Sequence, residues 1–267
     1  MSWEVLIPML MVLLVGFPHG AADGVLAVNL ARRGTIGLGA FFTLYGVITL
    51  SAAAFWLWLP VLSLISFLLL SVVHFGTLDS RHDRLVGRGI LRTLVHGSTL
   101  ICIIPWAHER EVTEIFGLLT GSEVVWLVQI LAAAALAWAI GVVWLGLAFG
   151  PAGQRAAGEL IVVAAVLIIL PPLWGFALYF CTVHSWRHMN AIVATLAPFG
   201  PAAFRLVALL TLVSFLLVIA GALVLPAVDI DSGIIRATFI SLAALTVPHF
   251  LLIDVYRVLS RLSATSR

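Results

Sequence analysis

The amino-acid sequence predicts an all-α protein, a polytopic bundle of transmembrane helices. Two observations predict this class: 63% of the 267 residues are hydrophobic, and only 10% are charged. A soluble domain carries about 25% charged residues. One small globule cannot bury so much apolar surface, so lipid must solvate much of it. We expect one integral-membrane domain over residues 1–267, because no polar segment is long enough for a second domain.

Apolar stretches separated by polar or Pro/Gly breaks predict the individual membrane segments. We expect about nine segments, with eight as the alternative because the sixth is short and ends at a Pro-Pro pair. The nine expected ranges are 4–29, 37–59, 61–79, 88–106, 123–149, 157–170, 172–197, 203–226 and 234–260.

The distribution of arginine across the loops predicts the orientation, since cytoplasmic loops collect basic residues. Arg32 and Arg33 follow the first expected segment, Arg155 follows the fifth, and Arg257 and Arg261 belong to the C-terminal end. With nine segments, every Arg-rich loop falls on one side of the membrane. We therefore expect a multi-pass protein of the inner (cytoplasmic) membrane of the cell, with its N-terminus outside and its C-terminus in the cytoplasm.

Composition also excludes two classes of function. The net charge is only +2, and the basic residues lie in short loops, so the chain lacks the basic surface that nucleic-acid binding requires. All fourteen basic residues are Arg. A retinal Schiff base needs a lysine amine, so a rhodopsin-type photoreceptor is excluded.

Histidines inside the expected membrane segments are the main functional observation. Of the eight histidines, His82 and His108 fall in polar loops, where we expect surface residues. Ionisable residues within the bilayer are costly and generally functional, and neutral imidazole suits Fe, Zn, Cu and Ni. We therefore predict a metal site built from several helices. The six histidines that lie in apolar segments are His19, His74, His96, His184, His188 and His249.

Spacing within and between the segments supports a shared site. His184 and His188 are four residues apart, so both rings lie on one face of a helix, about 5–6 Å apart. At about 1.5 Å rise per residue, His19, His74, His96, His188 and His249 fall roughly 6–20 Å from the cytoplasmic ends of their helices. A common depth is what one metal site would require.

Acidic residues follow three of these histidines at short spacing. Asp23 follows His19 by four residues, and a carboxylate at this distance can accept the second N–H of a metal-bound imidazole. Asp79 and Asp254 follow their histidines by five residues, and a solvated position near a helix end is the alternative for each. Arg187 is a buried cation that needs a partner, for which Asp23, Asp79 and Asp254 are the candidates.

Aromatic side chains neighbour the histidines in sequence. They can line an apolar pocket at the site, with ordinary core packing as the alternative for each. These residues are Phe75, Tyr179, Phe180, Trp186 and Phe250.

Five motifs surround these histidines in order along residues 16–254. The motifs are Gly16-Phe17-Pro18-His19-Gly20-Ala21-Ala22-Asp23; Ser71-x-x-His74-Phe75-Gly76-x-x-Asp79; Arg88-Gly89 with His96-Gly97; Tyr179-Phe180-x-x-x-His184-Ser185-x-Arg187-His188; and Pro248-His249-x-x-x-x-Asp254. Taken together and in this order, they resemble the Brp/Blh family of bacterial and archaeal integral-membrane β-carotene 15,15′-dioxygenases.

The resemblance implies cleavage of the central double bond of β-carotene by O₂, giving two all-trans-retinal molecules, and a functional link to an opsin. It also implies a non-haem Fe²⁺ held by His19, His74, His184 and His188. Other residues are expected around the metal or the substrate, and of these His96 or His249 could replace a ligand. They are Asp23, Asp79, His96, Arg187, His249, Asp254, Phe75, Tyr179 and Trp186.

Two other classes of membrane protein remain as alternatives. A haem protein that carries electrons would use histidine pairs on facing helices, and a transporter would use intramembrane His and Asp for proton or metal coupling. A di-iron hydroxylase would need clustered H-x-x-H-H boxes, which the sequence lacks.

Overall fold

The computed structural model describes residues 2–32, 34, 36–80, 89–190, 200–225 and 227–265, with side chains up to Leu252. All regular secondary structure in these ranges is helical, which confirms the all-α prediction. His82 and several loop arginines lie outside the described residues, and so does the side chain of Asp254.

Eight helices within the described ranges are long and apolar enough to cross a membrane. Seven of them match expected segments closely. Residues 172–190 of the expected seventh segment are helical, and the rest of that segment lies outside the described ranges. The eight spans are Trp3–Arg32, Leu38–Trp58, Pro60–Asp79, Gly89–Ala107, Val125–Ala148, Gly150–Ile169, Pro201–Val224 and Ile230–Leu252.

The prediction for the sixth segment was wrong in one respect. It is a full helix of 20 residues, Gly150–Ile169, and not a short stretch beginning at residue 157. Arg155 therefore lies within this helix and not in a loop. Gly150 has a φ of 56°, a left-handed conformation that glycine adopts without strain. This turn separates the helix from the preceding one. Residues 153–155, which include the polar Gln154 and Arg155, therefore belong to the helix.

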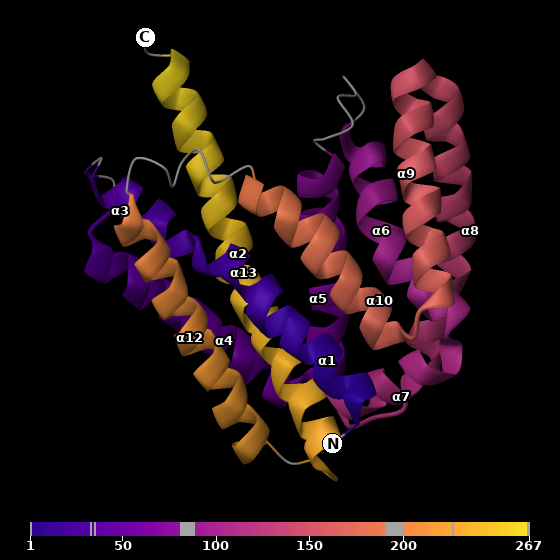
Figure 1. Cartoon of the computed structure of the whole chain (residues 1–267), viewed down its shortest axis with the longest axis horizontal. Helices are drawn as coiled ribbons and strands as arrows, with labels where there is room; N and C mark the ends of the chain where they lie inside the picture. The colour runs from indigo at the N-terminus through magenta and orange to yellow at the C-terminus, as the bar shows by residue number, and fades with distance from the viewer. Residues whose placement is uncertain are drawn as a thin grey trace. The chain divides into compact units, whose positions relative to one another are not determined.

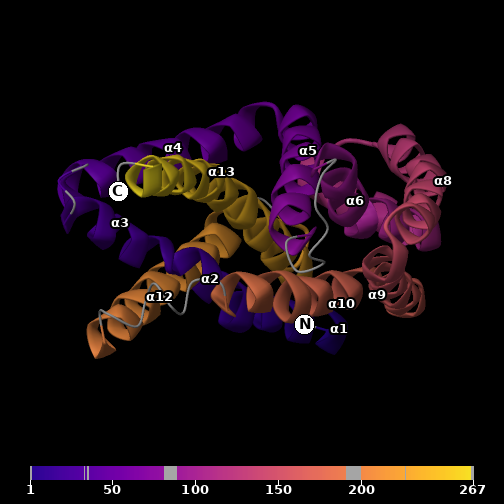
Figure 2. The ribbon, with the colours of Figure 1, turned by 90° about the horizontal axis from the view of Figure 1, so that it is seen from above.

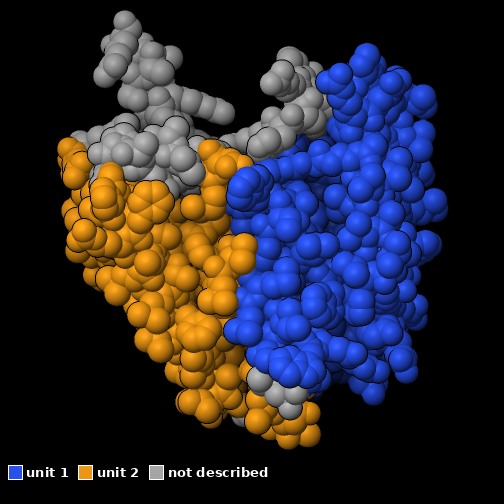
Figure 3. All heavy atoms as spheres, viewed as in Figure 1, with its two compact units in different colours: residues 1–11, 60–187 blue, residues 12–59, 188–267 orange. Residues whose placement is uncertain are grey.

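The described chain divides into two compact units, shown in separate colours in Figure 3. Unit 1 comprises Met1–Met11 and Pro60–Arg187, and unit 2 comprises Val12–Leu59 and His188–Arg267. The chain passes from unit 1 to unit 2 between Arg187 and His188, within a helical stretch.

Unit 1 contains most of the helices. They are α1 (Trp3–Met11), α5 (Pro60–Asp79), α6 (Gly89–Ala107), α7 (Glu109–Thr120), α8 (Val125–Ala148), α9 (Gly150–Ile169), α10 (Pro172–Leu178) and the π-helix η3 (Tyr179–Ser185). Helix α6 packs against α5, α8 and α9, and α8 packs against α9 (Figures 1 and 2). In this bundle the indole N–H of Trp138 donates to the hydroxyl of Thr99 at 2.9 Å, which joins α8 to α6.

Helices α5 and α6 touch through their backbones at two glycines. A Cβ atom on Gly76 would lie 1.9 Å from the carbonyl oxygen of Thr93, and one on Gly97 would lie 1.8 Å from that of Val72. Only glycine permits so close a crossing of membrane helices. His74 lies two residues before one of these glycines, so its backbone lies beside this close crossing.

The described part of unit 2 contains the π-helix η1 and five named α-helices. They are η1 (Val12–Gly16), α2 (Phe17–Ala21), α3 (Asp23–Arg32), α4 (Leu38–Trp58), α12 (Pro201–Val224) and α13 (Ile230–Thr265). Helix α13 packs against α4 and α12, and α12 also packs against α2 and α3. Their shared core is apolar and comprises Ala21, Ala22, Val25, Leu26, Ala27, Leu30, Phe41, Ala203, Val207 and Leu252.

Two helices of unit 2 keep most of their apolar surface uncovered. Only 6% of the apolar window of α4 and 11% of that of α12 is buried within the structure. Leu50 on α4 and Leu223 on α12 are both strongly exposed. Patches of this size need a nonpolar solvent, which supports the assignment of these helices to the hydrocarbon layer.

Candidate functional site

Unit 1 brings together two of the predicted metal-binding histidines. His74 on α5 and His184 in η3 are both buried, and their ring centroids lie 5.0 Å apart. Phe75 approaches His184 at 4.5 Å between ring centroids, and Phe180 stacks on it at 5.7 Å with a 17° interplanar angle. The imidazoles therefore lie in an apolar aromatic setting, as the sequence predicts for Phe75 and Phe180.

A buried carboxylate orients His184. The Oδ1 atom of Asp79 lies 3.4 Å from Nδ1 of His184, and the Tyr179 hydroxyl donates to Oδ2 of Asp79 at 2.7 Å. Asp79 is only 1% exposed, so the alternative of a solvated helix end is wrong. The partner of this carboxylate is His184, not His74, the histidine that precedes it in the sequence.

Arg187 has a partner that the sequence analysis did not include. Its guanidinium forms an ion pair with Glu159 of α9 and donates to the main-chain carbonyl of Asp79 at 3.3 Å. The Asp79 carboxylate was a predicted partner, but it is turned toward His184 and Tyr179. The omission of Glu159 is related to the error in the sixth segment. The predicted segment began at residue 157 and placed Glu159 near its start, whereas the helix begins at Gly150 and has Glu159 near its middle.

Unit 2 brings together three further buried histidines, one each from α2, the helical stretch after η3, and α13. The ring centroids of His19 and His188 lie 5.4 Å apart, those of His19 and His249 5.4 Å, and those of His188 and His249 5.2 Å. The three rings are steeply inclined to one another, with interplanar angles from 66° to 83°. We call these residues the unit 2 histidine triad.

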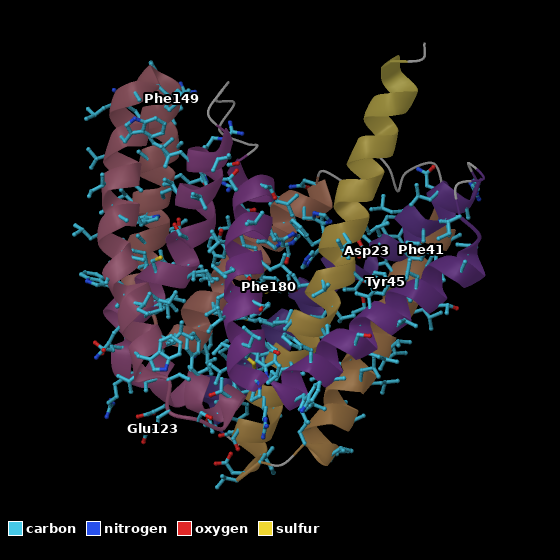
Figure 4. The ribbon with its side chains drawn as sticks, turned by 180° about the vertical axis from the view of Figure 1, so that it is seen from behind. Asp23, Phe41, Tyr45, Glu123, Phe149 and Phe180 are labelled. Carbon is cyan, nitrogen blue, oxygen red and sulfur yellow. The ribbon has the colours of Figure 1, made fainter. Side chains whose placement is uncertain are left out.

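Asp23 holds one member of this triad. Both carboxylate oxygens lie 2.9 Å from Nδ1 of His249, and the Tyr45 hydroxyl donates to Oδ2 at 3.1 Å. Figure 4 shows Asp23 and Tyr45 close together, next to Phe41. The sequence analysis did not single out Tyr45. A tyrosine inside an apolar segment was the available signal, since a buried phenol usually finds a hydrogen-bond partner.

The hydrogen bonds of three histidines indicate which nitrogen could bind a metal. The Nδ1 atoms of His184 and His249 face carboxylates, and Nδ1 of His19 is bonded to the Gly16 carbonyl. In a neutral imidazole, a proton on Nδ1 leaves the lone pair on Nε2. Donation of the other N–H to a carboxylate or a carbonyl is what metal-binding histidines usually do. The donor set therefore fits a metal that prefers imidazole.

The two π-helices found among the described residues both occur beside these histidines. His184 lies inside η3, and η1 ends at Gly16, whose carbonyl is bonded to His19. Short π-helical turns inside α-helices are frequent at functional sites. The sequence contains no direct indication of them, although Pro18 follows the end of η1.

The remaining predicted site residues occupy different surroundings. His96 is buried in α6, beside the crossing at Gly97. Trp186 is 65% exposed, so it does not line a pocket within its unit. His108 lies between α6 and α7 as expected, but it is half-buried, and its Nε2 lies 3.1 Å from the Leu167 carbonyl oxygen.

Comparison with known proteins identifies the family. The model of the β-carotene 15,15′-dioxygenase family matches residues 10–257. A curated protein named β-carotene 15,15′-dioxygenase, from an uncultured marine bacterium 66A03, is 29% identical over 252 residues, which cover 91% of this chain and 90% of that protein. No solved structure matches the chain. On the match across nearly its whole length, this chain belongs to the β-carotene 15,15′-dioxygenase family and is an oxygenase.

Proposed function

We propose that this enzyme cleaves the central 15,15′ double bond of β-carotene with O₂ and releases two molecules of all-trans-retinal. The reaction balances without an external reductant, because each carbon of the broken double bond takes one oxygen atom of O₂. The observation that carries the proposal is the presence, in a chain of this family, of buried histidines oriented by buried carboxylates in each of the two units.

The cofactor proposed for this reaction is Fe²⁺, with His19, His74, His184 and His188 as its ligands. All four are buried, and neutral imidazole is a suitable ligand for iron. When bound, the iron supplies the activation of O₂, which does not otherwise react readily with a closed-shell polyene. Four neutral ligands would leave coordination positions for small molecules.

The side chains of the protein would orient the ligands and exclude water. Asp79 accepts from Nδ1 of His184 and so fixes the ring and its tautomer. Phe180 stacks on His184, and Phe176 stacks on Phe180 at 5.6 Å with a 9° interplanar angle. This aromatic column gives the site an apolar wall, which can hold a hydrocarbon substrate and exclude water.

The membrane is the natural source of the substrate. β-Carotene dissolves in the hydrocarbon layer, and an enzyme whose described residues include eight apolar spans can take it laterally from lipid. The helical residues 172–190 belong to the expected seventh segment, which brings the number of crossings to nine. We therefore propose that the enzyme lies in the inner (cytoplasmic) membrane with its N-terminus outside and its C-terminus in the cytoplasm. The product aldehyde would then be available to an opsin in the same membrane.

Expression in cells that accumulate β-carotene tests the proposal. Loss of the orange colour and appearance of retinal by chromatography are expected with the wild-type chain, and neither is expected with His184→Ala or His74→Ala. His108→Ala is the matched control, because this histidine lies between α6 and α7 and bonds to the Leu167 carbonyl. A Soret band in the purified protein, or full activity of His184→Ala, would contradict the proposal.

A further inference from the structure

The unit 2 histidine triad contains one imidazole more than the ligands proposed for this unit. His19 and His188 are two of the proposed ligands, and His249 on α13 lies as close to each of them as they lie to each other. We propose that His249 also binds the metal through Nε2, with Asp23 as its positioning residue. This inference rests on the proposed function, since it concerns the same metal.

The separations of the three rings fit a single ion. Their centroids form a nearly equilateral triangle with sides of 5.4, 5.4 and 5.2 Å. The centre of such a triangle lies about 3.1 Å from each centroid, and a metal–nitrogen bond of about 2.1 Å places an ion about 3.2 Å from the centroid of its imidazole. The spacing of the three ring centroids is therefore compatible with one ion among them.

Edge-to-face packing of aromatic rings gives similar separations, so the hydrogen bonds decide between packing and ligation. Asp23 is 3% exposed, and both of its oxygens contact Nδ1 of His249 at 2.9 Å. A carboxylate so placed holds the proton on Nδ1 and increases the electron-donating power of Nε2. Packing of the ring alone does not require this arrangement, because burying a carboxylate in an apolar core costs free energy.

Tyr45 completes the arrangement from α4. Its hydroxyl donates to Oδ2 of Asp23 at 3.1 Å, so the carboxylate is held from two sides. The same order of groups occurs in unit 1, where Tyr179 donates to Asp79 and Asp79 faces His184, one of the proposed ligands. By this internal comparison, His249 occupies the position that the proposed ligand His184 occupies in unit 1.

Titration of the purified full-length protein with Co²⁺ tests the assignment without relying on turnover, because the visible bands of Co²⁺ report its coordination. We compare the wild type with His249→Ala, with His249→Gln, and with His108→Ala as the histidine control. The glutamine amide can still donate to Asp23, which favours folding, but it has no imidazole lone pair. The wild type and the control are expected to bind one Co²⁺ per chain with the same spectrum.

Both His249 variants are expected to bind Co²⁺ at least tenfold more weakly and with altered visible bands. Asp23→Asn is expected to weaken binding in the wild type by about 10–100-fold but to add little in the His249→Ala background, since it acts through that ring. Wild-type affinity and spectrum in folded His249→Gln would overturn the inference while leaving the proposed function intact. A wild-type protein that binds no metal would overturn both.

Discussion

Tyr179 and Asp79 are 100 residues apart in sequence, and the hydroxyl of the one donates a 2.7 Å hydrogen bond to the carboxylate of the other. The second oxygen of Asp79 faces His184. Unit 2 repeats this order with Tyr45, Asp23 and His249. Each unit thus presents a buried imidazole that faces a carboxylate, and this carboxylate also accepts a hydrogen bond from a tyrosine hydroxyl.

Removing the charge of Asp79 should weaken metal binding without removing a ligand. Asp79→Asn is expected to lower metal affinity by about 10–100-fold, because the amide no longer fixes the proton on Nδ1 of His184. Tyr179→Phe should act in the same direction and more weakly, since it leaves the carboxylate in place. Metal content after dialysis against graded chelator measures both. Unchanged metal retention in folded Asp79→Asn would show that the carboxylate serves packing alone.

The glycines at the crossing of α5 and α6 should be intolerant of any side chain. Gly76→Ala and Gly97→Ala would each place a Cβ atom inside a backbone carbonyl contact, which the helices can relieve only by moving apart. Overpacking of this kind costs about 1–3 kcal/mol or more. Thermal unfolding in detergent measures the loss.

Gly158→Ala in α9 is the matched control for the glycine variants. A Cβ atom at Gly158 would meet nothing within 4 Å, and the residue is exposed. Alanine is the better helix former by about 1 kcal/mol, so this variant should be neutral or slightly more stable. Equal tolerance of alanine at Gly76 and Gly158 would contradict the close crossing.

The two partners of the Arg187 ion pair should differ in importance. Glu159→Ala removes only the ion pair and leaves the bond from Arg187 to the Asp79 carbonyl, so it is expected to cost the smaller part of the stability. Arg187→Ala should cost more, because its guanidinium also donates to the Asp79 carbonyl beside the His184 site. Unfolding midpoints of the two single variants and the double variant measure the difference. A larger loss from Glu159→Ala than from Arg187→Ala would contradict this ranking.

Acid should loosen the start of α13. The backbone N–H of Ser232 donates to the Asp229 carboxylate at 2.7 Å, and hydrogen bonds from Ser232 hold the pKa of Asp229 below its usual range. A lowered folded-state pKa means that the charged cap stabilises the helix above the pH at which the unfolded chain titrates, and this contribution is lost as pH falls through the folded pKa. Asp229→Asn should remove this part of the acid dependence, as measured by unfolding midpoints between neutral and acidic pH. An unchanged acid dependence would be evidence against the cap.

The sequence predicted the membrane class and the positions of six histidines inside apolar helices, because both depend on local chemistry. Apolar runs of about twenty residues, and the ionisable groups within them, can be recognised in the sequence without knowledge of the fold. The pairings were harder to predict. Asp79 lies five residues after His74 but faces His184. Arg187 forms an ion pair with Glu159 of α9, a helix whose first residue was predicted wrongly. Such contacts depend on how helices cross, which in unit 1 is set by backbone contact at Gly76 and Gly97.

Tyr45 illustrates the same limit in unit 2. Its role depends on a carboxylate on another helix, and no spacing within the sequence connects the two. The π-helical turns at η1 and η3 could not be predicted from the sequence either, because they are defined by backbone hydrogen bonds and not by residue types.

The most direct test of the central claim is the yield of retinal per β-carotene consumed by the purified enzyme in detergent, measured with and without bound iron. The account predicts two retinal molecules per β-carotene with Fe²⁺ present, and no product after the metal is removed, with activity restored when Fe²⁺ is added back. Retinal formed at the full rate by metal-free protein, or no retinal from protein that carries its full complement of iron, would contradict it.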